Sequence, residues 1–517
     1  MSASAGRVLL IPKGDYDSSV TYNMLDMVFY GGKTYVCKQT STGNAPTNTV
    51  YWQIMLDGAS TFDALTDVQI NNVQDGDSIY WDSTAQKWKN TTPIGIVITS
   101  PPAKTDYASG DILDLTGIVV MAEYSSGTTR NITTECTFSP TNGATLTPSD
   151  TSVTVSWHSF TATQLIDVAQ IYGVEWDGSA SPVWTRTDAG VGLTDPVSAV
   201  NNGDGSSPFD NIKPWSEMVR VEDANAGTLV KIPKFYYKWT RNGASMKLQV
   251  SSGYFDGALV SPAHADRGDG HGERDVVYVG AYHNDSNYQS KTGVTPRNST
   301  AWATCRTNIH ALGSDIWQYD FAMYWTIGML YLVEYANWKQ QATIGRGDGV
   351  GGSLTANGAT DNMIYHTGTS ASTRSTAGHV RYRYIEDLWA NLHDFIDGAY
   401  ANGASAYCIK NPASFGNSGG TLVGTTFTSQ SNIKEFTNPS ESGFEYALFP
   451  SAVGGTYGVD YTCSLCSLST SANRVYTVGS SYGNSTDTTA ACTMFSIYTM
   501  SQTDPRGWHG SRLMKLP

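Results

Sequence analysis

The sequence predicts a multidomain protein made mainly of β-strands, on the basis of its length, its composition and its turn pattern. At 517 residues the chain is longer than one hydrophobic core usually organises. It holds 51 glycines, 30 tyrosines and 14 tryptophans, and only 15% of its residues are charged, which suits short strands joined by turns. Short apolar runs alternate with turn residues along most of the chain, and helical periodicity is confined to two runs.

The charge balance excludes some classes of partner. The chain has 46 acidic and 32 basic residues, a formal net charge of −14, and no run of Lys or Arg. A duplex-binding surface needs such a run, so nucleic acid is not an expected partner. Residues 1–16 lack the apolar core of a secretory signal, and no stretch of about 18 apolar residues occurs. We therefore expect a soluble protein made in a cytoplasm, with no membrane insertion, that reaches the outside by lysis or inside a particle.

The cysteines do not predict a disulfide framework, because they are scattered and odd in number. The seven positions are Cys37, Cys136, Cys305, Cys408, Cys463, Cys466 and Cys492.

Residues 1–57 are expected to form a small β unit. Its short strands are Leu9–Ile11, Met27–Tyr30 and Thr34–Lys38. Gly31 and Gly32 supply the hairpin turn between the last two. The spacing of aromatic residues from Tyr16 to Trp52 resembles the small carbohydrate-binding modules of chitinases, which are also common at the starts of phage tail proteins. Tyr35 and Trp52 are either the core of this unit or a platform for sugar.

Residues 58–93 are expected to form a hairpin linker, because polar and apolar residues alternate over Ser78–Asp82. The runs Leu65–Ile70, Gly76–Trp81 and Gln86–Asn90 resemble a short segment that recurs in tail fibres, often where chains trimerise. The resemblance implies a homotrimer that contacts other virion tail proteins through its N-terminal region. An ordinary linker hairpin is the alternative.

Residues 94–160 have the strand and turn spacing of a β-sandwich. The expected strands are Ile96–Thr99, Asp111–Leu115, Val119–Tyr124, Thr133–Phe138 and Ser152–Trp157. The pattern from Pro101 to Thr129 resembles bacterial Ig-like domains closely, and such domains act as rods and spacers.

Residues 165–517 form the largest unit, in which two helices are expected. Over Tyr324–Gln341 and over Ile385–Ile396, apolar residues recur at helical spacing. In the second run, Trp389 and Phe395 are expected to fill the core, while Asn391 and its neighbouring acids bond backbone groups.

Three stretches of this unit resemble the C-type-lectin-like fold of formylglycine-generating enzymes and of the variable tropism proteins of phages. They are Tyr324–Gly345, Ile385–Gly398, and the pair Phe449–Tyr457 and Gly507–Met514. The resemblance implies an α+β head that binds a receptor, protein or glycan, on a bacterial surface.

The expected receptor-binding residues lie between 457 and 506, where Tyr, Ser, Asn and Thr give a composition similar to that of antibody contact loops. They are Tyr457, Asp460, Tyr461, Asn473, Tyr476, Tyr482, Asn484 and Tyr498. The resemblance to the tropism proteins also implies diversification of this region by a retroelement. A glycine- and serine-rich surface loop of fixed sequence is the alternative.

An enzymatic function is the alternative to receptor binding. Cys463 and Cys466 lie near the position of the copper-binding cysteines of formylglycine-generating enzymes, and one such pair could contribute to a zinc site only with further ligands. A glycan hydrolase needs only two suitably spaced acids and leaves no sequence motif. We nevertheless expect a phage or prophage tail protein in the virion, and assign it no catalytic residue, metal or cofactor.

Overall fold

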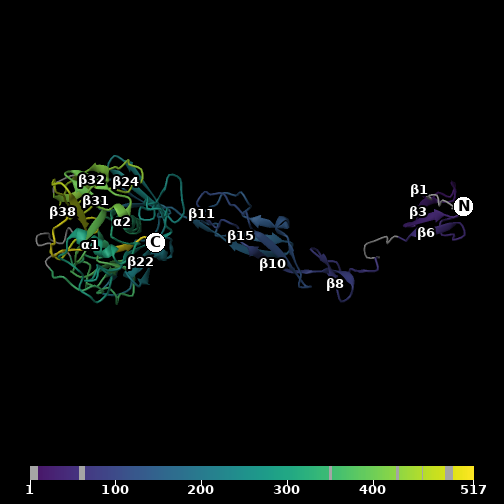
Figure 1. Ribbon diagram of the computed structural model, residues 1–517, viewed down its shortest axis with the longest axis horizontal. Helices are drawn as coiled ribbons and strands as arrows, with labels where there is room; N and C mark the ends of the chain where they lie inside the picture. The colour runs from purple at the N-terminus through teal and green to yellow at the C-terminus, as the bar shows by residue number, and fades with distance from the viewer. Residues whose placement is uncertain (1–9, 58–64, 349–351, 427–429, 457, 484–492) are drawn as a thin grey trace, which may run out of the picture. The chain divides into compact units, whose positions relative to one another are not determined.

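The computed structural model describes residues 10–57, 65–348, 352–426, 430–456, 458–483 and 493–517, and they are mainly β as predicted. The chain divides into two compact units. Unit 1 comprises Met1–Thr105, Asp114–Asn142 and Ser152–Leu165. Unit 2 comprises Asp106–Leu113, Gly143–Thr151 and Ile166–Pro517. Both are drawn in Figure 1.

Unit 1 begins with a small β module whose core is aromatic. Its four-stranded sheet has the order β1-β3-β4-β6, and β2 pairs with β5. The strands are β1 (Ile11–Asp15), β2 (Thr21–Tyr22), β3 (Asp26–Tyr30), β4 (Lys33–Cys37), β5 (Ser41–Thr42) and β6 (Trp52–Leu56). Tyr35 and Trp52 are 8% and 2% exposed and pack with Tyr22, Val28 and Cys37. These two rings are therefore core residues and not a sugar platform.

The predicted hairpin is present in the next segment. It consists of β8 (Ser78–Asp82) and β9 (Lys87–Thr91), with β7 (Val68–Gln69) parallel to β9. Val68 is buried, whereas Ile79, Trp81 and Trp88 are 49%, 41% and 39% exposed. This small sheet therefore leaves apolar side chains in contact with water.

The Ig-like segment contains two three-stranded sheets, β10-β12-β13 and β14-β15-β16. The strands are β10 (Pro93–Ser100), β12 (Val119–Tyr124), β13 (Thr129–Asn131), β14 (Thr137–Ser139), β15 (Ser152–Trp157) and β16 (Phe160–Leu165). Alternate residues of β12 and β15 are buried, as in one face of a sandwich sheet.

The strand predicted at Asp111–Leu115 is wrong, because only one isolated bridge, at Ile112, occurs there. Asp111 accepts a hydrogen bond from the backbone N–H of Ala108, and Asp114 accepts one from Thr116. Such local side-chain bonds compete with a sheet ladder. β11 (Asp106–Ala108) precedes this turn and pairs in parallel with β17 (Asp167–Ala169).

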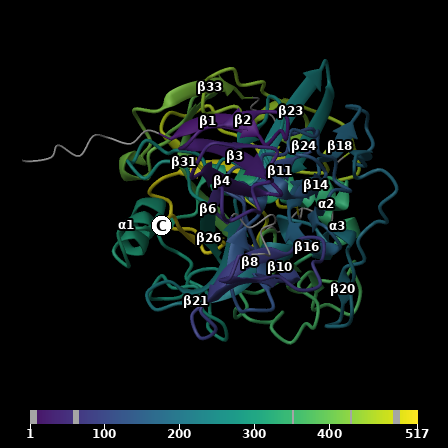
Figure 2. The same ribbon diagram turned by 90° about the vertical axis from the view of Figure 1, so that its right-hand side faces the viewer.

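Unit 2 is built around several sheets. A five-stranded antiparallel sheet comprises β18 (Tyr172–Trp176), β19 (Thr185–Asp188), β23 (Tyr236–Asn242), β24 (Ser245–Ser251) and β25 (Leu259–Val260). Its strands β18, β24 and β23 are seen side by side in Figure 2. A second five-stranded sheet comprises β21 (Val219–Asp223), β22 (Gly227–Pro233), β26 (Val276–Gly280), β27 (Ile316–Gln318) and β40 (Leu513–Lys515). The last strand of the chain, β40, lies between β26 and β27, so it closes that sheet.

The largest sheet of unit 2 is nine-stranded and carries most of the predicted binding region. It comprises β31 (His393–Asn402), β32 (Ser405–Cys408), β33 (Thr421–Thr425), β34 (Ser431–Phe436), β35 (Pro450–Val453), β36 (Leu465–Ser467), β37 (Arg474–Val478), β38 (Ile497–Ser501) and β39 (His509–Gly510). A four-stranded sheet comprises β20 (Ala199–Val200), β28 (Gly368–Thr369), β29 (Val380–Tyr382) and β30 (Ile385–Glu386).

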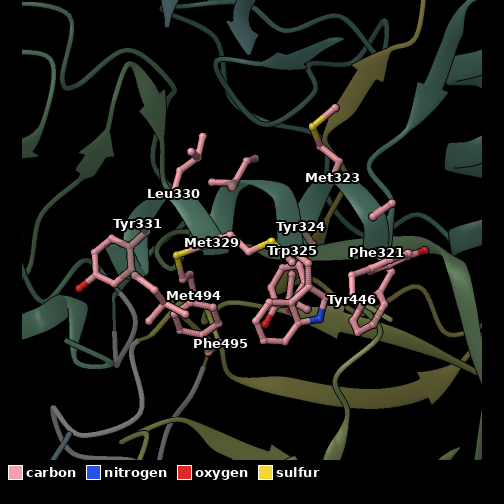
Figure 3. Close-up of a cluster of buried hydrophobic side chains, with 14 of the residues drawn as sticks. Phe321, Met323, Tyr324, Trp325, Met329, Leu330, Tyr331, Tyr446, Met494 and Phe495 are labelled. Atoms are coloured by element: carbon pink, nitrogen blue, oxygen red, sulfur yellow. The ribbon is translucent and has the colours of Figure 1, made fainter. Parts of the chain in front are cut away.

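Helix α2 (Phe321–Tyr335) is buried along its whole length. It starts at Asp320, whose side chain accepts the backbone N–H of Met323 at 2.7 Å, and it ends at Ala336, which has a φ of 48°. The predicted helix at 324–341 is therefore confirmed in its first part and interrupted by this left-handed residue before the short α3 (Gln340–Thr343). Aromatic side chains surround α2, and Trp325 lies 5.7 Å from Phe495 between ring centres (Figure 3).

The second predicted helix, Ile385–Ile396, is wrong. The segment forms β30, a turn in which Asp387 and Asn391 take positive φ, and the start of β31. Nearly all of β31 is buried, so its apolar residues do not alternate, and a strand of that kind cannot be distinguished from a buried helix by periodicity. Trp389 and Phe395 are core residues as predicted. The unpredicted α1 (Trp302–His310) buries Trp302, Cys305 and Ile309 at helical spacing.

Glu334 is the single acidic residue of α2, and Arg383 neutralises it. The guanidinium donates from Nε and Nη2 to the two carboxylate oxygens at 2.7 Å each. Tyr382 and Ser207 donate their hydroxyls to the same carboxylate at 3.0 and 2.8 Å. The charge is thus fully hydrogen-bonded in a site from which water is excluded.

We expect Glu334→Ala to lower the free energy of unfolding of unit 2 by about 3 kcal/mol, since it leaves the buried Arg383 charge with only the more exposed Asp210 carboxylate as a partner. Urea denaturation followed by tryptophan fluorescence measures the loss. The control is Glu222→Ala at an exposed position, which should change stability by less than about 0.5 kcal/mol. Equal effects of both substitutions would refute the importance of this ion pair.

Candidate functional site

The predicted receptor-binding residues are distributed over several parts of unit 2. Tyr457 and Asn484 lie outside the described residues. Asp460 and Tyr461 are partly exposed in the loop between β35 and β36, and Asn473 is exposed just before β37. The remaining three are Tyr476 in β37, Tyr482 after it, and Tyr498 in β38.

Tyr476 does not belong to a binding surface. Its side chain is 0% exposed, and its ring lies 5.1 Å from that of Phe449 and 6.5 Å from that of Phe321 on α2. Its expected contact role is therefore wrong in this fold, and the ring joins α2 to the nine-stranded sheet.

The loop that carries Asp460 and Tyr461 is held tightly. Asp460 accepts the backbone N–H of Thr456 at 2.6 Å, and the backbone N–H of Tyr461 donates to the Ala180 carbonyl at 2.7 Å. Gly455, at a φ of 81°, approaches so closely that a Cβ there would lie 2.7 Å from both Asp460 and the Tyr461 ring. Tyr461 is thus presented on a fixed backbone.

Tyr482 lies beside Trp508, a residue that the site prediction missed. The Tyr482 backbone N–H donates to the Asn391 carbonyl, and its hydroxyl donates to the Gly507 carbonyl, both at 3.0 Å. A Cβ on Gly483 would lie 2.7 Å from Trp508, so the two segments are in close contact. Trp508 is half-buried and has the Arg506 guanidinium 5.4 Å from its ring centre.

Asn473 and Tyr482 are separated by the length of a strand. They lie beyond opposite ends of β37, a strand of five residues that spans roughly 17 Å at about 3.3 Å per residue. Tyr498, on the neighbouring β38, has its ring 4.7 Å from that of His393. Residues that belong to one stretch of similar composition in the sequence therefore lie on different strands and loops of unit 2.

His379, Glu386 and Asp387 form a buried cluster whose potential ligand atoms lie within 4.8 Å of one another. The carboxylate oxygens already have partners. Glu386 accepts from the backbone N–H groups of Gly358 and Thr360, at 2.7 and 2.9 Å, and Asp387 accepts from His379 Nδ1 at 2.6 Å. Burial alone would lower the pKa of His379, but the charge of Asp387 and this hydrogen bond raise it to about 9. In the absence of a metal ion the imidazole is therefore protonated at neutral pH and forms an internal ion pair with Asp387.

The cysteine pair does not have the properties of a reactive thiol site. Cys463 and Cys466 are both buried, and burial raises the pKa of their thiols to about 11 and about 12. Thiolates are the nucleophilic form, so both groups are protonated and weak nucleophiles at neutral pH. Cys492, the nearest other cysteine in the sequence, lies outside the described residues.

A pocket of about 610 Å³ adjoins the Tyr461 loop. Its walls come from the segment after α2, which includes Lys339 and Arg346, and from the loop Ser372–Ser375. The Lys339 ammonium donates to the Gly458 carbonyl at 3.0 Å, which connects the pocket to the predicted binding region. Sequence reasoning missed it because its basic residues are isolated along the chain.

Comparison with known proteins identifies one part of the chain. Residues 100–165 match the bacterial Ig-like domain family (group 3), which confirms the prediction for this segment. No curated protein is significantly similar to the chain. Among the described residues, no helix is both long enough and apolar enough to cross a membrane.

We expect His379→Gln to change how stability depends on pH. The imidazole has a pKa of about 9 when folded and about 6.5 when unfolded, so its stabilisation is complete below pH 6.5 and is lost as pH rises to 9. The difference in unfolding free energy between wild type and variant, measured in urea at pH 6 and pH 9.5, should shrink by an amount on the order of 3 kcal/mol. His271→Gln, at an exposed position, is the control. A difference that does not change with pH would contradict the assignment.

Proposed function

We propose that the protein is a phage or prophage tail protein whose C-terminal unit binds a receptor on a bacterial surface. The observation that carries this proposal is the bacterial Ig-like domain at 100–165, a spacer module, which precedes a large unit with partly exposed aromatic loops. We infer that this unit is a C-type-lectin-like head, and its terminal strand β40 within a central sheet is consistent with that fold. The virion tail is the corresponding location.

Binding would be non-covalent and would depend on Tyr461, Tyr482 and Trp508. Partly exposed aromatic side chains contribute large contact areas and lose little conformational entropy. Tyr461 and Tyr482 lie on backbones fixed by the hydrogen bonds to Ala180 and Asn391, so few further degrees of freedom are lost on binding. Several copies on one particle would raise the overall affinity further.

Retroelement diversification remains part of this proposal. Exposed or partly exposed positions such as Asp460, Asn473 and Tyr482 could change without disturbing the core, whereas Tyr476 could not. A near-copy of the coding DNA for this region beside a reverse transcriptase gene, differing mainly at adenines, is the genomic observation that supports diversification. The absence of such a copy argues for a receptor-binding face of fixed sequence.

Receptor binding is tested with labelled full-length protein on a panel of bacterial strains. We expect Tyr461→Ala and Trp508→Ala each to weaken binding to a positive strain by about tenfold or more, because central aromatic contacts contribute most of the binding energy. Tyr254→Ala is the matched control, since this tyrosine is 55% exposed in the same unit but outside the loops.

Two results would count against receptor binding. One is equal binding by all three variants. The other is release of reducing sugar from cell envelopes by the purified protein, which would favour a glycan hydrolase instead.

We further propose that the hairpin β8–β9 contributes to a homotrimer. Three strands with exposed Ile79, Trp81 and Trp88 are marginal in isolation and would gain stability by burying these side chains against other copies.

We expect the double substitution Trp81→Ser and Trp88→Ser to shift the protein from trimer toward monomer in light scattering. The control is Phe29→Ser, which removes another half-exposed aromatic residue of unit 1. A monomeric wild type, or an unchanged trimer in the double variant, would refute this role.

A further inference from the structure

The pocket beside the Tyr461 loop carries a concentration of positive charge. Lys339, Arg346 and Arg374 line it, together with Ser372, Thr373 and Ser375. Its volume of about 610 Å³ lies within the range of about 300–1,000 Å³ that is usual for small-ligand sites. None of its described lining residues is acidic.

The three cations lack counterions within the described part of the chain. Most other buried or half-buried arginines of unit 2 pair with carboxylates, as Arg383 does with Glu334 and Arg512 with Asp394. No such ion pair forms at Lys339, Arg346 or Arg374 among the residues described here. Asp348 interacts with Arg346 only at longer range. An uncompensated positive pocket on a chain of net charge −14 attracts anions locally.

The side chains that line the pocket also have buried hydrogen-bond donors without acceptors. The Nε groups of Arg346 and Arg374 and the side-chain amide nitrogen of Gln341 are buried and have no hydrogen-bond partner among the described residues. A buried donor left unsatisfied costs about 1–3 kcal/mol, and more when it is charged.

The two walls of the pocket are held together before any ligand binds. The backbone N–H of Arg346 donates to the Arg374 carbonyl at 2.8 Å, so the two walls are joined. Arg374 Nη2 donates to the Ser198 carbonyl at 2.9 Å, and Lys339 is fixed by Gly458. Little ordering is therefore required on binding.

We propose that this pocket binds an acidic sugar unit of the bacterial receptor, through the oxyanion of a phosphate or carboxylate substituent. Two guanidinium groups and an ammonium suit either oxyanion. The volume and the rim hydroxyls of Ser372, Thr373 and Ser375 provide space and partners for the sugar ring. This inference rests on the proposed receptor-binding function and names the ligand class.

Calorimetric titration of the full-length protein with glucose 1-phosphate, glucuronate, glucose and inorganic phosphate tests the inference. We expect at least one acidic sugar to bind and glucose not to bind. Raising the ionic strength from about 0.05 to 0.5 M should weaken binding, because salt screens partly exposed charges. Binding of glucose 1-phosphate alone identifies a phosphate ligand, and binding of glucuronate alone identifies a carboxylate ligand.

The decisive variant is Arg346→Gln. The Arg346 guanidinium makes no hydrogen bond with a described residue, so the substitution removes a charge from the pocket without breaking such a bond. It should weaken binding of the acidic sugar by about tenfold or more, since a charge-assisted hydrogen bond contributes about 1.5–3 kcal/mol. Lys291→Gln removes the same charge at an exposed position outside the pocket and should bind as the wild type does. Circular dichroism melts verify that both variants are folded.

Three results overturn the inference: no heat with either acidic sugar, equal affinity of Arg346→Gln and wild type, or inorganic phosphate binding as tightly as the sugar phosphate. Because the titration contains no cells, its failure is distinguishable from failure of receptor binding. A wild-type protein that adheres to bacteria yet gives no heat refutes only the acidic-sugar ligand.

Discussion

The burial of α2 is the constraint on which unit 2 depends. A helix with all fifteen residues buried has no solvated face, so each polar group on it needs a partner from another segment. At its start, Asp320 caps the helix and pairs with Arg267. Near its end, Glu334 pairs with Arg383. Both arginines come from distant parts of the sequence, so the helix cannot be neutralised until much of the unit has assembled around it.

This constraint also positions the surface that we propose to be functional. The left-handed Ala336 turns the chain out of α2 and into the segment with Lys339 and Arg346, one wall of the basic pocket. The other wall, Ser372–Ser375, lies between β28 and β29, and Arg383 follows β29 directly. The Glu334–Arg383 pair therefore connects two elements. One is the sheet with β28 and β29, which carries the wall Ser372–Ser375, and the other is helix α2, which precedes the wall with Lys339 and Arg346.

Strands were predicted correctly from the sequence where their residues alternate between two different environments, and incorrectly where all residues are buried. The hairpin at Ser78–Asp82 was found because polar and apolar residues alternate there, and the Ig-like strand Ser152–Trp157 was found for the same reason. The strand β31 was mistaken for helix because nearly every position is buried, which erases the period of two. Burial likewise explains the error at Tyr476, since composition alone does not distinguish a core tyrosine from a contact tyrosine.

The basic pocket could not be predicted because Lys339, Arg346 and Arg374 span thirty-six residues with no local motif, and only the fold brings them together. Their grouping is nevertheless the feature least explained by folding. At many other places in unit 2 buried acids and bases compensate one another, as in His379 with Asp387 and Arg512 with Asp394. Three unpaired like charges and three unsatisfied donors around one cavity oppose stability in the free protein. Local conflicts of this kind concentrate at functional sites, where a ligand supplies what the chain itself does not.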